Sequence, residues 1–319
     1  MLRYTFSAPD VAGLRFAISP LGELGLGLRA MRLPEHYPLQ TPWVNHIRPV
    51  LPMLDLDILF GLVDDRRWVA DFLGPRPDAP LTSIDDELRR LSRISPQRLG
   101  ADLEAVNGSI PPAFRGEHRA VVRRMIEAIA ATWHLCFAPH WPRMRAVLEA
   151  DVAHRGRLLA LGGYEELFSS LAPSVSWDGE HLDIRLRADF AGDYPLQGRG
   201  MTLLPSIFVN GASTPIDPAR PPMLMYPARG QGAMWSGTRA ADPGAVADLL
   251  GAPRAALLAA LGEPASSTEL AARAGVTTSA INQHLRVMER SGLLNRTRYG
   301  RSVLYYRSDL GDSLARGEG

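Results

Sequence analysis

Between residues 278 and 286 the chain carries polar side chains at the spacing of one helix face. They are hydroxyls, amides and one guanidinium, without an acid among them: Thr278, Ser279, Asn282, Gln283 and Arg286. The side chains between them include Ile281 and Leu285, which suit a buried face. Asparagine and glutamine can hydrogen-bond to the edge of adenine, and arginine to the edge of guanine. The pattern therefore predicts a helix that contacts base edges in the major groove of double-stranded DNA.

A basic hairpin is predicted directly after this helix. Residues 293–298 and 302–307 have strand-like composition, and Tyr299-Gly300 is expected to form the tight turn between them. Four arginines lie along the two strands and the turn: Arg296, Arg298, Arg301 and Arg307. Such arginines are expected to lie along phosphates or to enter a minor groove. The predicted DNA contacts of the hairpin are Arg296, Arg298, Tyr299 and Arg301.

The positive charge of the chain is concentrated in this part. Residues 273–307 hold seven arginines and one acid, Glu289, so they carry a formal charge of +6, whereas the whole chain carries +1. A concentrated positive field is typical of nucleic-acid binding. All basic residues are arginines. The absence of lysine excludes a lysine nucleophile, a Schiff base and a phosphate-loop lysine.

Three helices are predicted to position the polar face. The first spans 245–261 and is interrupted at 251–254. Ser267 is expected to cap the second, and Gly275 to end it in a left-handed conformation. Val276 is expected to pack in the following turn. Thr277 should cap the third helix, which runs to about Ser291. Ser267 and Thr277 are also among the predicted DNA-contacting residues.

The segment 270–294 resembles the ArsR-type winged helix of bacterial repressors. Residues 251–254 are similar to the opening helix of that family, and the turn at 300–301 with the strand 303–306 is similar to its wing. The overall layout resembles long actinobacterial regulators with this domain at the C-terminal end. The resemblance implies a winged helix-turn-helix fold and a DNA-binding regulator, and it carries over no activity for the rest of the chain.

The sequence departs from this family in two respects. Metal-sensing members have two cysteines before the second helix, where this chain has Ser266 and Thr268. Because the only cysteine is Cys136, thiolate sensing of a soft metal is not expected, and no metal or cofactor is predicted. Many members dimerise through a helix after the wing, whereas only residues 308–319 follow here. Homodimerisation is therefore expected to depend on the long N-terminal part or on the helix at 245–261, and we predict an interface that involves residues before 240.

The predicted fold class is α+β in three parts. Residues 1–172 are expected to be mainly helical and to serve dimerisation or effector binding, because apolar residues recur at helical spacing along 117–136 and 142–171. Residues 173–240 are expected to form a β-rich subdomain, and residues 241–319 the winged helix. Helices at 20–32 and 56–73 and strands at 2–6 and 14–18 are also predicted. Ser19 is expected to cap the helix at 20–32, with Pro20 at its first position.

Other residues could do chemistry, but each has a simpler interpretation. His134, Cys136 and His140 include metal-binding groups, yet a cysteine at the end of an apolar helix is usually a small buried hydrophobe. Asp151 and His154 lie one helical turn apart and could form an acid–base pair, but a surface contact is the simpler explanation. Four aromatic residues could line an effector pocket or fill a core: Trp177, Phe208, Tyr226 and Trp235.

The sequence favours a cytoplasmic transcriptional regulator, acting as a repressor and homodimer on a pseudo-palindromic operator. It has no expected signal peptide or membrane span, and an unidentified small-molecule effector is left open as a partner. The protein is not expected to be an enzyme. The alternative is an enzyme or metabolite-binding protein with a DNA-binding C-terminal domain. A third hypothesis is a structural adaptor, which ion-paired wing arginines would favour.

Overall fold

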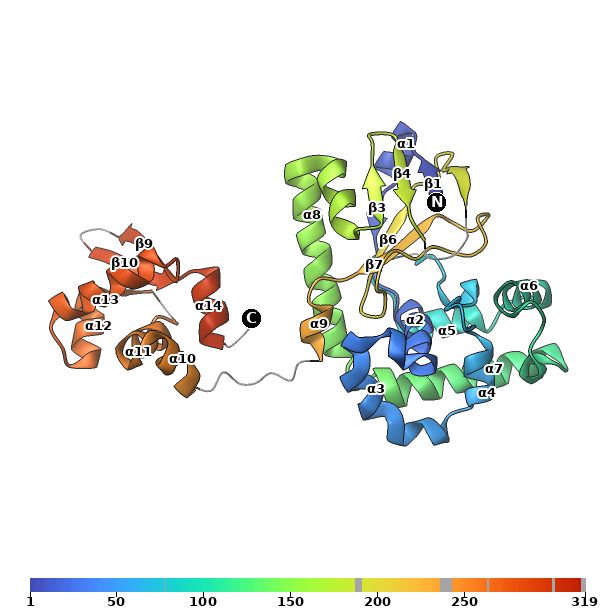
Figure 1. The fold of residues 1–319 in the computed structure, drawn as a ribbon, viewed down its shortest axis with the longest axis horizontal. Helices are drawn as coiled ribbons and strands as arrows, with labels where there is room; N and C mark the ends of the chain where they lie inside the picture. The colour runs from blue at the N-terminus through green and yellow to red at the C-terminus, as the bar shows by residue number, and fades with distance from the viewer. Residues whose placement is uncertain (78, 187–190, 236–242, 263, 300–301, 317–319) are drawn as a thin grey trace. The chain divides into compact units, whose positions relative to one another are not determined.

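The computed structural model describes residues 1–319 except 78, 187–190, 236–242, 263, 300–301 and 317–319. The chain divides into two compact units, Met1–Trp235 and Ser236–Gly319 (Figure 1). The first unit combines helices with two sheets, and the second combines helices with one small sheet. The predicted α+β class is confirmed.

Helix α2 (Pro20–Arg32) forms the centre of the first unit. Ser19 accepts a hydrogen bond from the Gly22 amide, and Pro20 occupies the first helical position, as the sequence predicts. Glu87 of α5 (Ile84–Leu91) adds a second cap, because its carboxylate accepts the Leu21 amide and the Ser19 hydroxyl, both at 2.7 Å. Two elements far apart in sequence thus meet at the start of α2.

The other helices of this unit are short where prolines are frequent and long where they are not. Residues 56–73 form only a six-residue helix followed by irregular chain, instead of the one long helix expected. The α-helices are α1 (Ala8–Ala12), α3 (Thr41–Ile47), α4 (Leu56–Gly61), α6 (Pro96–Asn107), α7 (His118–Thr132), α8 (Trp141–Leu171) and α9 (Gln231–Met234). Short 3-10 turns lie at Pro34–His36, Pro38–Gln40, Arg48–Met53, Asp71–Leu73 and Pro112–Phe114.

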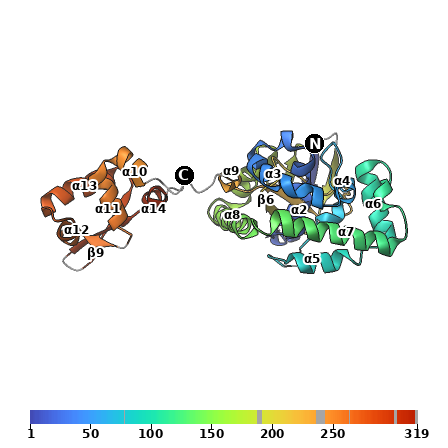
Figure 2. The same cartoon turned by 90° about the horizontal axis from the view of Figure 1, so that it is seen from below.

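A π-helical turn, Trp133–Phe137, separates the two longest helices. Figures 1 and 2 show that α7 and α8 run in steeply different directions on either side of this turn. Cys136 lies in the turn and is fully buried, and Trp43 donates a hydrogen bond to its carbonyl oxygen at 2.9 Å. The turn therefore redirects the chain and at the same time joins the core around α3.

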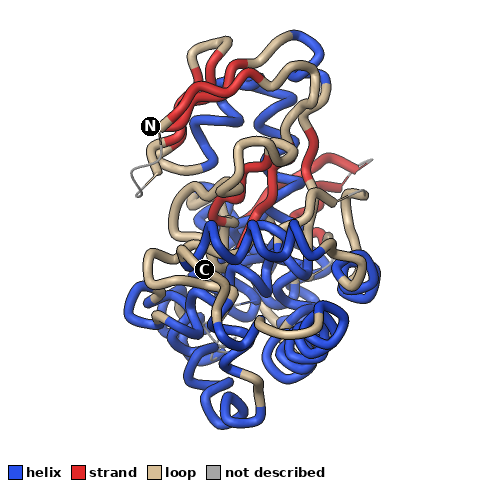
Figure 3. Tube along the Cα trace, turned by 90° about the vertical axis from the view of Figure 1, so that its right-hand side faces the viewer, coloured by secondary structure: helices blue, strands red, loops and turns tan. Residues whose placement is uncertain are grey.

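Both sheets of the first unit contain strands from the start of the chain. β1 (Leu2–Thr5) lies between β4 (His181–Ile184) and β5 (Gly192–Pro195), antiparallel to the former and parallel to the latter. β3 (Val175–Trp177) completes this sheet, and β2 (Arg15–Phe16), β6 (Thr202–Ser206) and β7 (Met223–Pro227) form a parallel one. Residues 173–235 therefore share both sheets with β1 and β2 (Figure 3).

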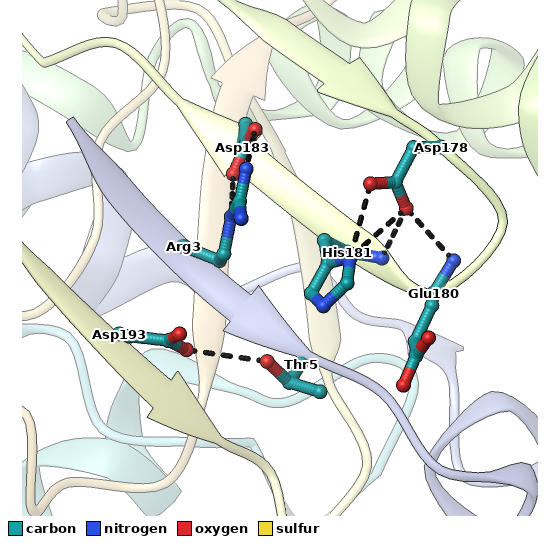
Figure 4. Close-up of polar contacts among 7 residues, drawn as sticks. All are labelled: Arg3, Thr5, Asp178, Glu180, His181, Asp183 and Asp193. Carbon is teal, nitrogen blue, oxygen red and sulfur yellow. Dashed lines mark hydrogen bonds and ion pairs between the residues drawn. The ribbon is translucent and has the colours of Figure 1, made fainter.

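Polar contacts hold the antiparallel part of the first sheet. The Arg3 guanidinium donates two hydrogen bonds of 2.7 Å to the Asp183 carboxylate across the β1–β4 pair (Figure 4). Asp178 accepts the backbone amides of Glu180 and His181 and so closes the β3–β4 turn. These amides, together with the His181 ring, lower the pKa of Asp178 to about 2. The turn therefore keeps an ionised carboxylate over the whole neutral range.

The second unit surrounds its own small core. Its helices are α10 (Pro243–Leu250), α11 (Ala252–Ala260), α12 (Ser267–Ala274), α13 (Thr278–Arg290) and α14 (Asp309–Arg316), and its strands are β8 (Ala265–Ser266), β9 (Leu294–Tyr299) and β10 (Ser302–Arg307). Leu257, Leu270, Ile281, Leu285 and Met288 are among the buried residues that form the core. β10 is the middle strand of the sheet, with β8 and β9 on either side.

We predict that Glu87→Ala lowers the free energy of unfolding of the first unit by about 3 kcal/mol, because several buried donors lose their acceptor. All six tryptophans lie in residues 1–235, so tryptophan fluorescence during urea unfolding monitors this unit alone. Asp85→Ala, at an exposed acid in the same helical turn, is the matched control and should change the free energy by less than about 0.5 kcal/mol. Equal losses in both variants would contradict the proposed role of Glu87.

Candidate nucleic-acid interface

Helix α12 begins with a capping box. The Ser266 hydroxyl accepts the Glu269 amide, and the Glu269 carboxylate accepts the Ser266 amide at 2.7 Å. The Ser266 amide and hydroxyl lower the pKa of Glu269. The sequence interpretation is wrong by one position here, because Ser266 is the cap and Ser267 is the half-buried first residue of the helix. Glu269 lies three residues after Ser266, which is the spacing of a capping box, so it completes the box with Ser266 and not with Ser267.

The turn between α12 and α13 follows the predicted backbone. Gly275 has a φ of 66°, in the left-handed region that favours glycine, and the Thr277 hydroxyl accepts the Ala280 amide to cap α13. Val276 differs from its expected packing role, because 49% of it is exposed. Thr277 is also exposed. The turn is held by its caps and backbone rather than by burial of the valine.

Helix α13 separates apolar and polar side chains onto two faces. Ile281, Leu285 and Met288 are at most 3% exposed and belong to the core. On the polar face, Ser279, Gln283 and Arg286 are exposed, whereas Thr278 and Asn282 are half-buried. The fold therefore brings all five predicted base-contacting residues of the helix onto one element, with Gln283 and Arg286 the most accessible long side chains.

The β9–β10 hairpin carries part of the predicted basic surface. Arg298 is exposed and forms no ion pair with a described residue, whereas exposed Arg296 pairs with Glu289 of α13 at 3.0 Å. Tyr299 is the last residue of β9 and pairs with Ser302, so Tyr299 is in a strand rather than in the expected turn. The Tyr299 side chain and all of Arg301 lie outside the described residues.

Arg307 has a structural role instead of the expected place in the basic hairpin surface. Its guanidinium donates to the carbonyl oxygens of Leu258 and Ala259, both at 2.7 Å, and pairs with Asp312 of α14. These contacts satisfy carbonyl groups at the end of α11, where a cation is favourable. Arg307 therefore ties three elements of the unit together.

A helix, α14, follows the hairpin although the sequence suggested none. Ser308 precedes it and accepts the Gly311 amide at 3.1 Å through its hydroxyl. A Cβ atom at Gly311 would lie 2.1 Å from the Leu293 carbonyl oxygen, so only glycine permits this close packing. The signal that could have identified the helix is a serine cap before Asp309 and Leu310, followed by Leu314.

The residues considered for metal binding and catalysis have other surroundings. Among the described residues, no group of three histidines, cysteines or acids could hold a metal ion. Asp151 is buried, pairs with Arg155 at 3.5 Å and accepts the Arg229 amide. It therefore makes a buried contact between α8 and the segment after β7, rather than the surface contact expected with His154.

The first unit contains a cavity of about 460 Å³ that the sequence analysis did not place. None of Trp177, Phe208, Tyr226 and Trp235 lines it, and Phe208 and Tyr226 are fully buried core residues. The titratable groups that line it include Glu23, Arg29 and Asp71. The sequence signal for this site was the presence of Glu23 and Arg29 within a helix whose remaining residues, apart from the terminal Arg32, are apolar or glycine.

Two parts of the chain match known families. Residues 254–297 match a helix-turn-helix domain family. This match indicates a DNA-binding transcriptional regulator. Residues 111–232 match a family of unknown function, DUF5937. The comparisons with curated proteins and with solved structures gave no significant match. Within the described residues, no helix is long and apolar enough to cross a membrane.

The capping box generates a prediction about two neighbouring serines. Ser266→Ala should increase hydrogen exchange of the α12 amides about fivefold, because loss of an N-cap costs about 1 kcal/mol. Ser267→Ala, the matched control, should leave this exchange nearly unchanged. Mass spectrometry of exchanged peptides covering 265–275 measures both variants. Faster exchange in Ser267→Ala alone would support the cap expected from sequence instead.

Proposed function

We propose that the protein is a repressor that binds a pseudo-palindromic operator as a homodimer through an ArsR-type winged helix-turn-helix. The observation that carries the proposal is the polar face of α13, where Ser279, Gln283 and Arg286 are exposed. Within this helix no acidic residue precedes Glu289. Hydroxyl, amide and guanidinium groups are suited to base edges. A helix face that only contacts solvent usually carries acidic side chains. Their absence from this face therefore favours a nucleic-acid partner.

In this proposal the two basic elements have different tasks. Helix α13 enters the major groove, where Gln283 and Arg286 contact bases. The β9–β10 hairpin is the wing, where Arg298 contacts backbone phosphate and sets affinity rather than sequence preference. Arg296 shares its charge with Glu289 and so contributes less. Binding to DNA would place the protein in the cytoplasm of a bacterial cell.

We propose a dimer because of the geometry of DNA recognition. One recognition helix covers few base pairs, and a two-fold operator is matched by two copies of the domain. We place the dimer contacts in residues before 240. In this proposal such a dimer represses transcription when it occupies a promoter.

The first unit supports a second function, binding of a small molecule. The supporting observation is the cavity, which brings Glu23, Arg29 and Asp71 together with apolar side chains. The two carboxylates accept backbone amides of Ile207, Ile216 and Asp217, so we propose a binding role for the unit rather than a catalytic one.

We predict that Gln283→Ala and Arg298→Ala weaken DNA binding in different ways. Gln283→Ala should weaken operator binding about fivefold or more and leave non-specific binding unchanged, because a good base contact contributes about 1–3 kcal/mol of discrimination. Arg298→Ala should weaken both, and should flatten the slope of log K against log salt by about two units, at about 0.9 per phosphate contact in each of two copies.

Salt titrations on an operator, first selected from random duplexes with the full-length protein, and on a scrambled duplex measure both effects. Arg123→Ala removes an equal charge from an exposed site on α7 and is the matched control. A slope change of one unit would indicate a monomer. An unchanged slope combined with lost preference at one base pair would show that the wing contacts bases.

We also predict that micromolar zinc, arsenite or cadmium does not release the protein from DNA. Ser266 and Thr268 provide no thiolate, and burial raises the pKa of the Cys136 thiol to about 11, which keeps it protonated and unreactive. Fluorescence anisotropy of labelled operator measures release. Metal-induced release that persists in Cys136→Ser would show that a thiol-independent metal site exists.

A further inference from the structure

The cavity of the first unit lies between α2, the segment 66–74 and the chain from 204 to 216. Its volume of about 460 Å³ falls in the range of small-molecule sites. Most of its wall is apolar or aromatic, and includes Leu26, Trp68, Leu73, Leu204, Ile216 and Met225. A ligand of this cavity must therefore have a substantial apolar body.

The Arg29 side chain places a positive charge in the cavity wall, and no described carboxylate forms an ion pair with it. Its guanidinium donates to the Ser213 hydroxyl at 3.3 Å and interacts with the Tyr37 hydroxyl, and it forms no ion pair with a described carboxylate. Burial lowers the pKa of Arg29, and the Nε atom is buried without a hydrogen-bond partner among the described residues. The nearby Asp64 attracts Arg29, but its carboxylate pairs with Arg66 and accepts the Trp68 amide. Because buried charges are normally paired, the site can accommodate a further anion at Arg29.

The carboxyl groups that line the cavity, those of Glu23 and Asp71, accept hydrogen bonds from backbone amides and form no ion pair with Arg29. Glu23 accepts a hydrogen bond from the Ile207 amide at 2.9 Å. Burial raises the pKa of Glu23 to about 7, so this carboxyl group is only partly ionised near neutral pH. Asp71 accepts the amides of Ile216 and Asp217, both at 2.8 Å. Each carboxyl group thus fixes a loop instead of neutralising Arg29.

The rim of the cavity adds further arginines and a strained residue. Arg67 lines the cavity and has a φ of 70°, in a region that residues other than glycine rarely adopt. Such strain is concentrated at functional sites. Arg66 lies over the Trp68 ring, with its guanidinium carbon 4.1 Å from the ring centroid. Arg29 and Arg67 thus bring positive charge to a largely apolar cavity, whereas Arg66 is paired with Asp64.

We propose that this cavity binds an organic carboxylate with an apolar body, held by the Arg29 guanidinium. A planar guanidinium matches a carboxylate in geometry. A phosphate dianion fits less well, because the first amides of α2 are already bonded to Ser19 and Glu87 and because Asp71 adds negative charge. The assignment rests on the ligand-binding function proposed for the first unit and is independent of DNA binding.

The test is calorimetric titration of the full-length protein with matched probes. These are 1-naphthylacetate, its neutral amide and 1-naphthyl phosphate, with decanoate and decanol as a second pair of different shape. At least one carboxylate should bind about tenfold or more tightly than its neutral partner, because a hydrogen-bonded charge pair contributes about that factor. Carboxylates that bind no better than their neutral partners, or a phosphate that binds more tightly, would overturn the carboxylate assignment while leaving a binding function. No binding of any probe would overturn the site itself.

Substitutions of Arg29 test whether the ligand binds in this cavity. Arg29→Gln should remove the preference for the carboxylate, and Arg29→Lys, which keeps the charge without the planar fork, should restore only part of it. Arg123→Gln removes an exposed charge from α7 and should bind as the unaltered protein does. A preference that survives in folded Arg29→Gln would place the ligand elsewhere. If Arg29→Gln does not fold, the comparison of acid with neutral partner in the unaltered protein still decides the proposal.

Discussion

Helix α2 runs through the centre of the first unit with ten of its thirteen residues buried, so its polar groups must be satisfied by protein instead of water. Its amides at the start are bonded to Ser19 and to Glu87, and Glu23 bonds to the amide that follows β6. Gly27 allows the Phe137 ring to pack directly on the helix, because a Cβ atom there would lie 2.6 Å from the ring. The same helix thus joins α5, the parallel sheet and the π-helical turn.

The second unit uses its arginines in two ways. Arg307 is only 15% exposed and holds the end of α11 against α14, whereas Arg286 and Arg298 remain exposed. Arg296 is intermediate, since it pairs with Glu289 but stays largely exposed. Formal charge along a sequence therefore overstates the charge that is free for a partner, and burial decides which guanidinium groups are available.

Local signals predicted the helix-turn-helix well, because caps and left-handed glycines act over a few residues. Gly275 and Thr277 have the expected roles, and the interior cap Ser19 was predicted for the same reason. The cap of α12 was misplaced by one residue, because Ser266 and Ser267 are adjacent at the start of this helix and only the hydrogen bond with Glu269 distinguishes them. The pairing of β1 with strands some 180 residues away and the cavity around Arg29 depend on contacts that no local pattern encodes.

The central place of β1 has a consequence for biosynthesis. Its hydrogen-bonding neighbours, β4 and β5, are separated from it by most of the first unit, so one of its edges stays unpaired until residue 184 has left the ribosome and the other until residue 195 has. Closing such a long loop is slow, and an unpaired strand can associate with other chains in the interval. Helices α2 to α8 can form earlier from local contacts. The nascent chain can therefore build its helical part first, and it incorporates β1 and β2 only after their partner strands β4, β5 and β6 have been made.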